Sequence, residues 1–241
     1  MDGAPTPSPA AAGAVDGSFF ASLREETRFF ILRHGQSEGN ARLVIQGKLD
    51  FPLDGAGRSQ ARAAGEWLAS RGIEEVISSP LARAAETARI VAAACGLGES
   101  SLHGSLAELD TGIFSGLSLE EAKERFPGPY AEFESRSWEG VPGAESQEAL
   151  YGRALEAWEL LRGRAAAGRR RIACVSHGGF IQWLLRSTFG CRSWMPLVPT
   201  GNCGVFELLV APTGAGRPAY LQWHLVNFQP AAALASLPPV F

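Results

Sequence analysis

Short apolar runs alternate along most of the chain with longer segments that carry apolar residues at helical spacing. Runs of strand type cover residues 28–33, 74–79, 171–177, 203–212 and 219–228. Segments of helical type cover residues 57–70, 80–95, 118–126, 146–167 and 179–189. The run at 28–33 is typical of a strand buried on both faces of a sheet. Strands that alternate with helices predict an α/β fold, a three-layer sandwich whose mostly parallel central sheet carries helices on both faces.

Local signals mark the ends of several of these elements. Pro80 suits the first turn of a helix, where its missing N–H is not needed. Ser118 and Glu121 stand at the spacing of a capping box, which predicts the start of the helix that follows. The segment TGAGRP, residues 213–218, has turn composition and separates the last two predicted strands.

Composition divides the chain into one domain with two flanking segments. Residues 1–26 are rich in Ala, Pro, Gly and Ser and are predicted to form a disordered or loosely docked leader. Residues 27–228 form a single domain without an internal repeat, and residues 229–241 form a C-terminal tail. A chain of 241 residues that is 46% hydrophobic has enough apolar surface to bury a large core.

Charge and cysteine usage exclude several classes of protein. The net charge is −3, so the chain lacks the basic field of nucleic-acid binders. The four cysteines show neither C-x-x-C pairing nor metal-ligand spacing. No apolar stretch is long enough to span a bilayer, and the N-terminus lacks the pattern of a signal peptide. We expect a cytoplasmic protein with no nucleic-acid or membrane partner. The apolar strands near the C-terminus would suit a homodimer edge, and burial within the sheet would give the same pattern.

Charged and imidazole side chains follow the ends of three predicted strands. The first run ends in Arg33 and His34, and the run RIACVS ends in His177, followed by Gly178. Arg83 lies in the first turns of the helix behind the run EEVISS. In such sheets ligands bind beyond the carboxyl ends of the strands, so these side chains are predicted to meet in one pocket. Guanidinium groups and helix N-termini favour a phosphate dianion there, and glycine lets the backbone approach it closely.

The histidines give this pocket a reactive group. A neutral imidazole keeps a free lone pair near neutral pH, so it can attack the phosphorus that the arginines bind. The neighbouring guanidinium charges disfavour protonation of the imidazole. Alone, His34 would be read as a polar residue at the end of a strand. Together with Arg33, Arg83 and His177 it favours a catalytic interpretation.

Five motifs give the chain a family resemblance. LRHGQSEGN, SSPLARAAETA, LAELDTGIFSG, PGAES and VSHGGFI occur in the order found in the histidine phosphatase superfamily, which includes the cofactor-dependent phosphoglycerate mutases and many small-molecule phosphatases. The resemblance covers residues 28–210 and implies a phosphoglycerate mutase-like fold. It implies that His34 is the nucleophile that becomes phosphorylated. It also implies that Arg33, Arg83 and His177 bind the phosphoryl group, and that Glu108 is the general acid/base.

Further residues match weaker parts of the family pattern. Asn40 falls where the family contacts the phosphoryl group, and Ser37 belongs to the same loop. Gln46 is a candidate contact at the rim, and Gly178 a candidate backbone contact. Asp110 would project to the other face of an extended segment and is ranked below Glu108. The sequence also departs from the pattern: Ser115 stands where an acidic residue is common.

These features predict a metal-independent phosphatase that acts on a small phosphomonoester. The segment between LAELD and PGAES is shorter than the insertion typical of cofactor-dependent phosphoglycerate mutases, which makes hydrolysis a better prediction than mutase activity. Two alternatives stay open, a phosphoglycerate-type mutase and a catalytically inert module that binds a phospholigand or a protein. A binding module would not need both a nucleophile and an acid. The spacing of histidines, cysteines and carboxylates supports no metal site, and no cofactor is expected.

Overall fold

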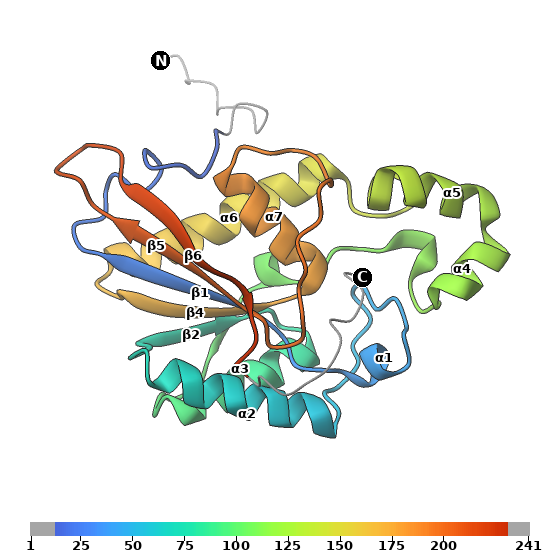
Figure 1. The fold of residues 1–241 in the computed structure, drawn as a ribbon, viewed down its shortest axis with the longest axis horizontal. Helices are drawn as coiled ribbons and strands as arrows, with labels where there is room; N and C mark the ends of the chain where they lie inside the picture. Colours follow the sequence, from blue (N-terminus) through green and yellow to red (C-terminus); the bar gives the residue numbers. More distant parts are fainter. Residues whose placement is uncertain (1–12, 231–241) are drawn as a thin grey trace, which may run out of the picture.

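A six-stranded sheet forms the centre of the computed structural model, which describes residues 13–230 (Figure 1). The strands lie in the order β3-β2-β4-β1-β5-β6. Their bounds are β1 Thr27–Arg33, β2 Glu75–Ser78, β3 Ser101–Leu102, β4 Arg171–Ser176, β5 Val205–Ala211 and β6 Tyr220–Phe228. The strands β3, β2, β4 and β1 run parallel, and β5 and β6 extend the sheet through antiparallel pairs. The mostly parallel sheet predicted from the sequence is confirmed.

Helices cover both faces of this sheet. Their bounds are α1 Glu38–Ala41, α2 Gly55–Ala69, α3 Ala82–Ala94, α4 Leu119–Arg125, α5 Pro127–Arg136, α6 Gln147–Ala166 and α7 Gly178–Thr188. Helices α2 and α3 lie on one face, α6 and α7 on the other, and α4 and α5 form an arm beside the sheet (Figure 1). No helix within residues 13–230 has both the length and the apolar character needed to cross a bilayer.

Strand β1 contributes side chains to the hydrophobic cores on both faces of the sheet, as its apolar run predicts. Phe30 and Leu32 belong to the core that includes α2 and α3, whereas Phe29 and Ile31 belong to the core that includes α6 and α7. Successive side chains of a strand point to opposite faces, so a strand with a layer on each side must be apolar throughout. The catalytic candidates that follow β1 therefore stand on a strand held from both sides.

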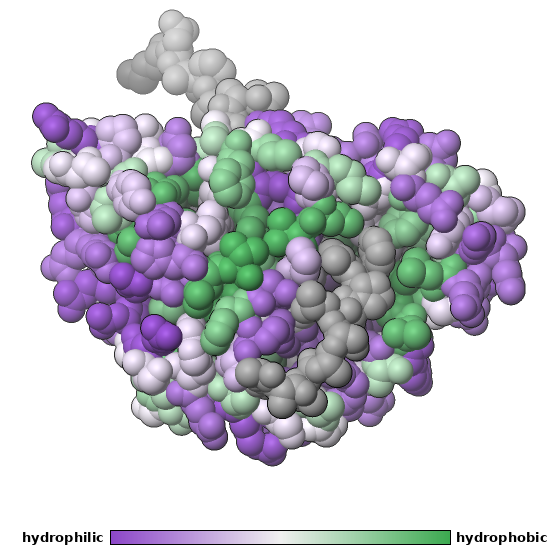
Figure 2. Space-filling model, in the orientation of Figure 1, coloured by the Kyte–Doolittle hydropathy of each residue, from purple (hydrophilic) through white to green (hydrophobic). Residues whose placement is uncertain are grey.

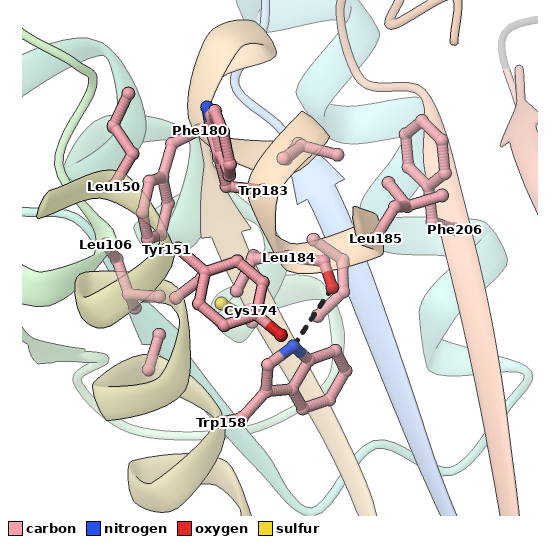
Figure 3. Packing of buried hydrophobic residues seen from close by; sticks show 14 of the residues in the cluster. Leu106, Leu150, Tyr151, Trp158, Cys174, Phe180, Trp183, Leu184, Leu185 and Phe206 are labelled. Carbon is pink, nitrogen blue, oxygen red and sulfur yellow. Dashed lines mark hydrogen bonds between the residues drawn. The ribbon is translucent and has the colours of Figure 1, made fainter. Parts of the chain in front are cut away.

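The larger core fixes helix α7 against α6 and the sheet (Figure 3). Trp158 of α6 is fully buried, and its indole Nε1 donates to the Leu184 carbonyl of α7 at 3.0 Å. Its ring lies 5.6 Å from the ring of Phe29 on β1, edge to face. Close packing of this kind leaves little freedom for α7, whose N-terminus faces the candidate site.

The second half of the predicted leader belongs to the folded unit. Val15, Phe20 and Leu23 are buried in the larger core, and the ring of Phe20 lies 5.9 Å from that of Trp158. The Val15 N–H also donates to the Ser187 carbonyl at 2.8 Å. A loosely docked leader is therefore wrong for residues 13–26, because a few apolar anchors within an Ala- and Gly-rich composition suffice to pack it. Residues 1–12 and 231–241, the rest of the predicted leader and tail, lie outside the described residues.

Two predicted helix starts have different outcomes. The capping box of α4 is present, since the Glu121 N–H donates to Ser118 Oγ at 3.1 Å and the Ser118 N–H donates to the Glu121 carboxylate at 2.7 Å. Helix α3, predicted from residue 80, begins two residues later, at Ala82. Its Leu81 N-cap offers no side-chain acceptor, and the Ala82 N–H donates instead to Asp50 Oδ1 at 2.7 Å.

The arm of α4 and α5 is packed around aromatic side chains. Phe114 is fully buried and its ring lies within 6.4 Å of the rings of Phe126, Tyr130, Phe133 and Trp138. Helix α5 has no counterpart among the predicted elements, because its first turn contains Pro127, Gly128 and Pro129, a composition typical of loops. Proline is tolerated there, since the first N–H groups of a helix have no partner within it.

Strand β6 forms one edge of the sheet and alternates between exposed and half-buried residues. Tyr220 and Val226 expose 53% and 52% of their surface, and Phe228 exposes 38%. Figure 2 shows hydrophobic side chains gathered in the middle of this face of the molecule, beside a mainly hydrophilic area. Strand β5 is an internal strand. The predicted homodimer edge therefore stays a prediction that concerns β6 alone.

Candidate active site

Two adjacent parallel strands bring the two candidate histidines together. Strand β1 ends at Arg33, which pairs in register with Ser176, the last residue of β4. His34 and His177 follow these residues, and their ring centroids lie 5.1 Å apart. The His34 N–H donates to the Ser176 carbonyl at 3.0 Å, so the ladder extends one step beyond the strand. The register of the sheet thus sets the distance between the two rings.

His34 is fixed in one tautomer. Its Nδ1 lies 2.7 Å from the Gly35 carbonyl oxygen, which can only accept, so Nδ1 carries the proton. The lone pair therefore resides on Nε2, to which Arg83 Nε donates at 3.3 Å. Burial, and then the charges of Arg83 and Arg33, hold the pKa of His34 well below its usual value of 6.5. A neutral imidazole with a directed lone pair is what a nucleophile requires.

Arg83 is held rigidly beside that lone pair. Its two terminal nitrogens donate to the carbonyls of Leu49 and Gly47 at 2.7 and 2.8 Å. The side chain is almost fully buried, and burial lowers the pKa of Arg83 while the Glu108 carboxylate raises it. A guanidinium anchored in this way loses little entropy when it binds a phosphoryl group.

Three buried polar atoms without a protein partner belong to residues of the site or next to it. They are Arg33 Nε, His177 Nδ1 and Thr200 Oγ1, and they make up three of the six such atoms among the described residues. Arg33 also donates to the Thr200 carbonyl, and the Ser79 hydroxyl lies 2.7 Å from His177 Nε2. Unpartnered buried polar atoms are rare in folded proteins, and two of these, Arg33 Nε and Thr200 Oγ1, lie on either side of Gly178 and form a cradle suited to an anion.

The cradle carries positive charge at neutral pH. Burial lowers the pKa of Arg33 to about 10, so its guanidinium stays protonated. Burial, followed by the charges of Arg83, His34 and Arg33, keeps the pKa of His177 well below 6.5, so this imidazole is neutral. The cations of the base are therefore the two arginines, and the imidazoles add polar contacts without adding charge.

Gly178 leaves the cradle open. A Cβ at this position would lie 3.0 Å from Thr200 Oγ1 and 3.3 Å from Arg33 Nε. Any side chain would therefore occupy the space between the unpartnered atoms. The predicted backbone contact of Gly178 with a ligand stays a prediction, and the glycine of this motif that lines the pocket is Gly179.

Glu108 lies on the N-terminus of α7. Its carboxylate accepts from the N–H groups of Gly179 and Phe180 at 3.1 and 2.9 Å, and from its own neighbour Leu109 at 2.9 Å. A Cβ on Gly179 would approach the same carboxylate to 2.8 Å, so the second glycine of VSHGGFI makes room for Glu108. Asp110, ranked below Glu108, exposes 45% of its side chain and lies 3.7 Å from Lys48.

The loop residues predicted to bind substrate divide into two groups. Asn40 and Gln46 line the pocket, whereas Ser37 does not. The Ser37 hydroxyl lies 3.0 Å from Asn40 Oδ1 and 2.8 Å from Gln46 Oε1, either of which can accept its single proton, and it caps helix α1. Because the Asn40 oxygen is already an acceptor, its amide N–H groups are the donors that it offers to a ligand. Ser37 therefore orients the two amides from behind.

Thr200 and Asn202 lie next to the predicted residues and were not predicted from the sequence. Asn202 Nδ2 donates to the His34 carbonyl at 3.1 Å and to Asn40 Oδ1 at 3.2 Å, which links His34 to the loop that carries Asn40. Ligand-binding residues are expected beyond the carboxyl ends of parallel strands, and neither Thr200 nor Asn202 follows such a strand. Strand β5 is antiparallel to β1, so the segment before β5 reaches the same edge of the sheet. Two glycines around an asparagine just before a strand were the available signal.

The pocket itself is small and has two kinds of lining. Its volume is about 40 Å³. The base contains Arg33, His34, Arg83 and Glu108, and the wall contains Val44, Ile45, Leu109 and Trp138. Within residues 13–230, no group of three or more His, Cys, Asp or Glu side chains is arranged to hold a metal ion. The base can thus bind a dianion through guanidinium groups and present an imidazole lone pair to it.

Comparison with known proteins agrees with this geometry. A sequence model of the histidine phosphatase superfamily (branch 1) matches residues 29–219. The chain is 40% identical over 157 residues to "Phosphoglycerate mutase-like protein 4" of Arabidopsis thaliana, which covers 64% of this chain and 67% of that protein. It is 34% identical over 170 residues to "Probable phosphoglycerate mutase GpmB" of Salmonella paratyphi B, which covers 68% and 76%.

A solved structure extends the likeness to the fold. The mycobacterial glucosyl-3-phosphoglycerate phosphatase in complex with VO3 superimposes with a TM-score of 0.71 at 28% identity, over 83% of this chain and 99% of that one. The match confirms the phosphoglycerate mutase-like fold that the five motifs imply. With most of the chain covered by the family and the motif residues gathered at one sheet edge, the protein belongs to the histidine phosphatase superfamily.

Proposed function

We propose that this protein is a metal-independent phosphatase that hydrolyses a small phosphomonoester through a phosphohistidine on His34. The observation that carries the proposal is the hydrogen bond between His34 Nδ1 and the Gly35 carbonyl. This bond leaves the lone pair on Nε2, in a pocket that also holds two buried guanidinium groups. The neutral state of the ring, set by burial and by the arginines, keeps the lone pair available.

In the first step, His34 Nε2 attacks the phosphorus and the bond to the alcohol oxygen breaks. Protonated Glu108 gives its proton to that oxygen, so the alcohol leaves neutral and Glu108 becomes a carboxylate. Arg33 and Arg83 bind the phosphoryl oxygens as charge redistributes, together with the imidazole of His177. The Asn40 amide adds a neutral donor. The charge on the phosphoryl group is balanced by guanidinium groups, so no step uses a metal ion.

In the second step, water hydrolyses the phosphohistidine. The Glu108 carboxylate takes a proton from the water as its oxygen attacks phosphorus. The bond from phosphorus to Nε2 breaks, and its electron pair returns to the imidazole. Inorganic phosphate leaves, His34 is neutral again, and Glu108 carries the proton for the next cycle. Support for the role as base comes from the place of Glu108 in the pocket, where α7 N–H groups hold and orient its carboxylate.

A phosphoglycerate-type mutase is the second candidate, because two relatives carry that name. It would share the first step and then return the phosphoryl group from His34 to a different hydroxyl of the acid. The two functions differ only in the acceptor of the second step, which is water in the phosphatase.

The test is rapid-quench mass spectrometry of the protein after mixing with p-nitrophenyl phosphate and a panel of phosphomonoesters in chelator. We expect one phosphoryl group on His34 and release of inorganic phosphate. His34→Ala should lose the adduct and at least about a thousandfold of turnover, whereas His103→Ala, at a half-buried histidine outside the pocket, should keep both. Unchanged turnover in His34→Ala would refute the mechanism, and so would well-folded protein that forms neither adduct nor phosphate. Phosphoryl transfer between positions of a glycerate, without phosphate release, would favour the mutase.

A further inference from the structure

The cations of the pocket all lie at its base. Among the described residues that line it, the cationic side chains are Arg33 and Arg83. Both are tied to backbone carbonyls, Arg33 to Thr200 and Arg83 to Leu49 and Gly47. Neither guanidinium is free to swing toward a second anionic group of the substrate. Under the proposed function both serve the phosphoryl group, and no lining cation is left for the alcohol part.

The wall above the base is apolar. Ile45, Leu109 and Trp138 are buried there and Val44 is half-buried. The alcohol part of a substrate whose phosphoryl group is bound at the base would extend along this wall. A carboxylate in that place would give up its hydration and could meet neutral donors of the lining residues Asn40, Gln46 and Thr111, but no countercharge.

Negative charge on the protein adds to this cost. The Asp110 carboxylate follows the lining residue Leu109, whereas Glu108 is the protonated acid when the substrate binds under the proposed function. Lys48 follows the lining residue Gly47. Its Nζ lies 3.7 Å from Asp110 Oδ2, so the negative charge of Asp110 offsets the positive charge of Lys48. Its side chain is 56% exposed, which screens what remains. Beside the apolar wall, a second anion on the substrate therefore finds the Asp110 carboxylate and, among the lining residues, no cation other than the two arginines of the base.

We infer that the substrate is a phosphomonoester of a neutral alcohol, without a carboxylate or a second phosphate close to the ester. The inference rests on the proposed function and narrows it. It also weighs against a phosphoglycerate mutase, whose substrate carries a carboxylate two carbons from the phosphate ester. The wall selects the alcohol part by the absence of countercharge, and the base binds the phosphoryl group that all candidates share.

The experiment compares glycerol 3-phosphate with 3-phosphoglycerate, which have the same carbon number and differ in a CH2OH group against a carboxylate. Each is measured as a competitive inhibitor of p-nitrophenyl phosphate hydrolysis by the full chain, and as a substrate by phosphate release. We expect glycerol 3-phosphate, whose alcohol part is neutral, to have an inhibition constant lower by about tenfold or more and a higher kcat/KM than 3-phosphoglycerate. Equal constants, a preference for 3-phosphoglycerate, or no inhibition by either compound would overturn the inference.

A charge placed in the wall sharpens the test. Val44→Lys should shift the ratio of the two inhibition constants toward 3-phosphoglycerate by about tenfold, while Val44→Met, of similar length and no charge, should leave the ratio near that of the wild type. Failure of the proposed function would look different, because p-nitrophenyl phosphate itself would then not be hydrolysed and the substrate inference would fall with it. If p-nitrophenyl phosphate is hydrolysed but 3-phosphoglycerate is preferred to glycerol 3-phosphate, the substrate inference alone is refuted.

Discussion

The base and the wall of the pocket are built by different means. Arg33 and His34 of the base stand on the sheet, where the pairing of Arg33 with Ser176 sets their positions, and Arg83 of the base stands on α3. The wall comes from connecting segments, and side-chain packing around Phe114 rather than backbone register holds Trp138 in place. A strand ladder fixes positions more tightly than a packed loop segment does.

This difference separates chemistry from selection. The proposed nucleophile and phosphate ligands occupy the rigid part, while the groups that face the alcohol occupy a part whose length and sequence can vary. The same base can therefore serve many phosphomonoesters, as expected when function resides in sites placed on a shared fold. Substitutions in the base should change rates with little change in stability, and substitutions in the wall should do the reverse.

The largest expected effect is the loss of Arg83. Arg83→Gln removes the guanidinium that donates to His34 Nε2 and that is held by two backbone carbonyls. We expect kcat/KM for p-nitrophenyl phosphate to fall by about a thousandfold, because charge on the phosphoryl oxygens loses a preorganised partner. Arg89→Gln is the matched control, since Arg89 lies on the same helix with its side chain exposed, and it should stay within about twofold. Similar losses in both variants would contradict the assigned place of Arg83.

In the wall, the largest expected effect is on stability. Phe114→Ala empties the centre of the aromatic cluster, so the free energy of unfolding should fall by about 4 kcal/mol in urea denaturation. Turnover of p-nitrophenyl phosphate by the folded variant should change by less than about tenfold, since no base residue moves. Phe126→Ala, at a half-buried member of the cluster, should cost less stability. A loss of turnover as large as that of Arg83→Gln would show that base and wall are not separable.

The base was predictable because its residues follow strands that the apolar runs reveal. Arg33, His34 and His177 each stand at or directly after the end of such a run, and parallel strands bring their carboxyl ends to one edge. The outcome for Ser37 could not be read in the same way. A serine in a polar loop suits a helix cap and a phosphate contact equally, and only the position of Gln46 behind it decides for the cap.

Other parts depend on contacts between segments far apart in the chain. Asn202 reaches His34 because β5 is antiparallel to β1, and strand direction is not written in an apolar run. Phe20 was hidden in a leader of disordered composition, although its ring packs against Trp158 across 138 positions of sequence. Helix α5 was hidden by prolines that its first turn tolerates. In each case tertiary packing overrode the local signal.

The smallest of these predicted effects is the loss of folding stability at acid pH, and it arises from the two histidines at the base of the pocket. His34 and His177 are buried next to arginines, and these surroundings hold their folded-state pKa values well below the value of 6.5 expected when unfolded. Below about pH 6.5 the unfolded chain takes up protons that the folded chain does not, so these residues make stability fall as pH falls toward the folded-state pKa values. Each contributes a slope of up to about 1.4 kcal/mol per pH unit, and the contribution vanishes above pH 7.

Urea denaturation of wild type and of the double variant His34→Gln/His177→Gln between pH 7.5 and 5.5 isolates this contribution. The double variant should lose up to about 2.7 kcal/mol per pH unit of the acid slope, because glutamine does not titrate, while carboxylates contribute equally to both proteins. His224→Gln removes an exposed histidine on β6 and should keep the wild-type slope. If the double variant kept it too, the imidazoles would already be protonated in the folded base. His34 would then have no lone pair for the phosphorus, and the chemical role assigned to the base would fail with its electrostatics.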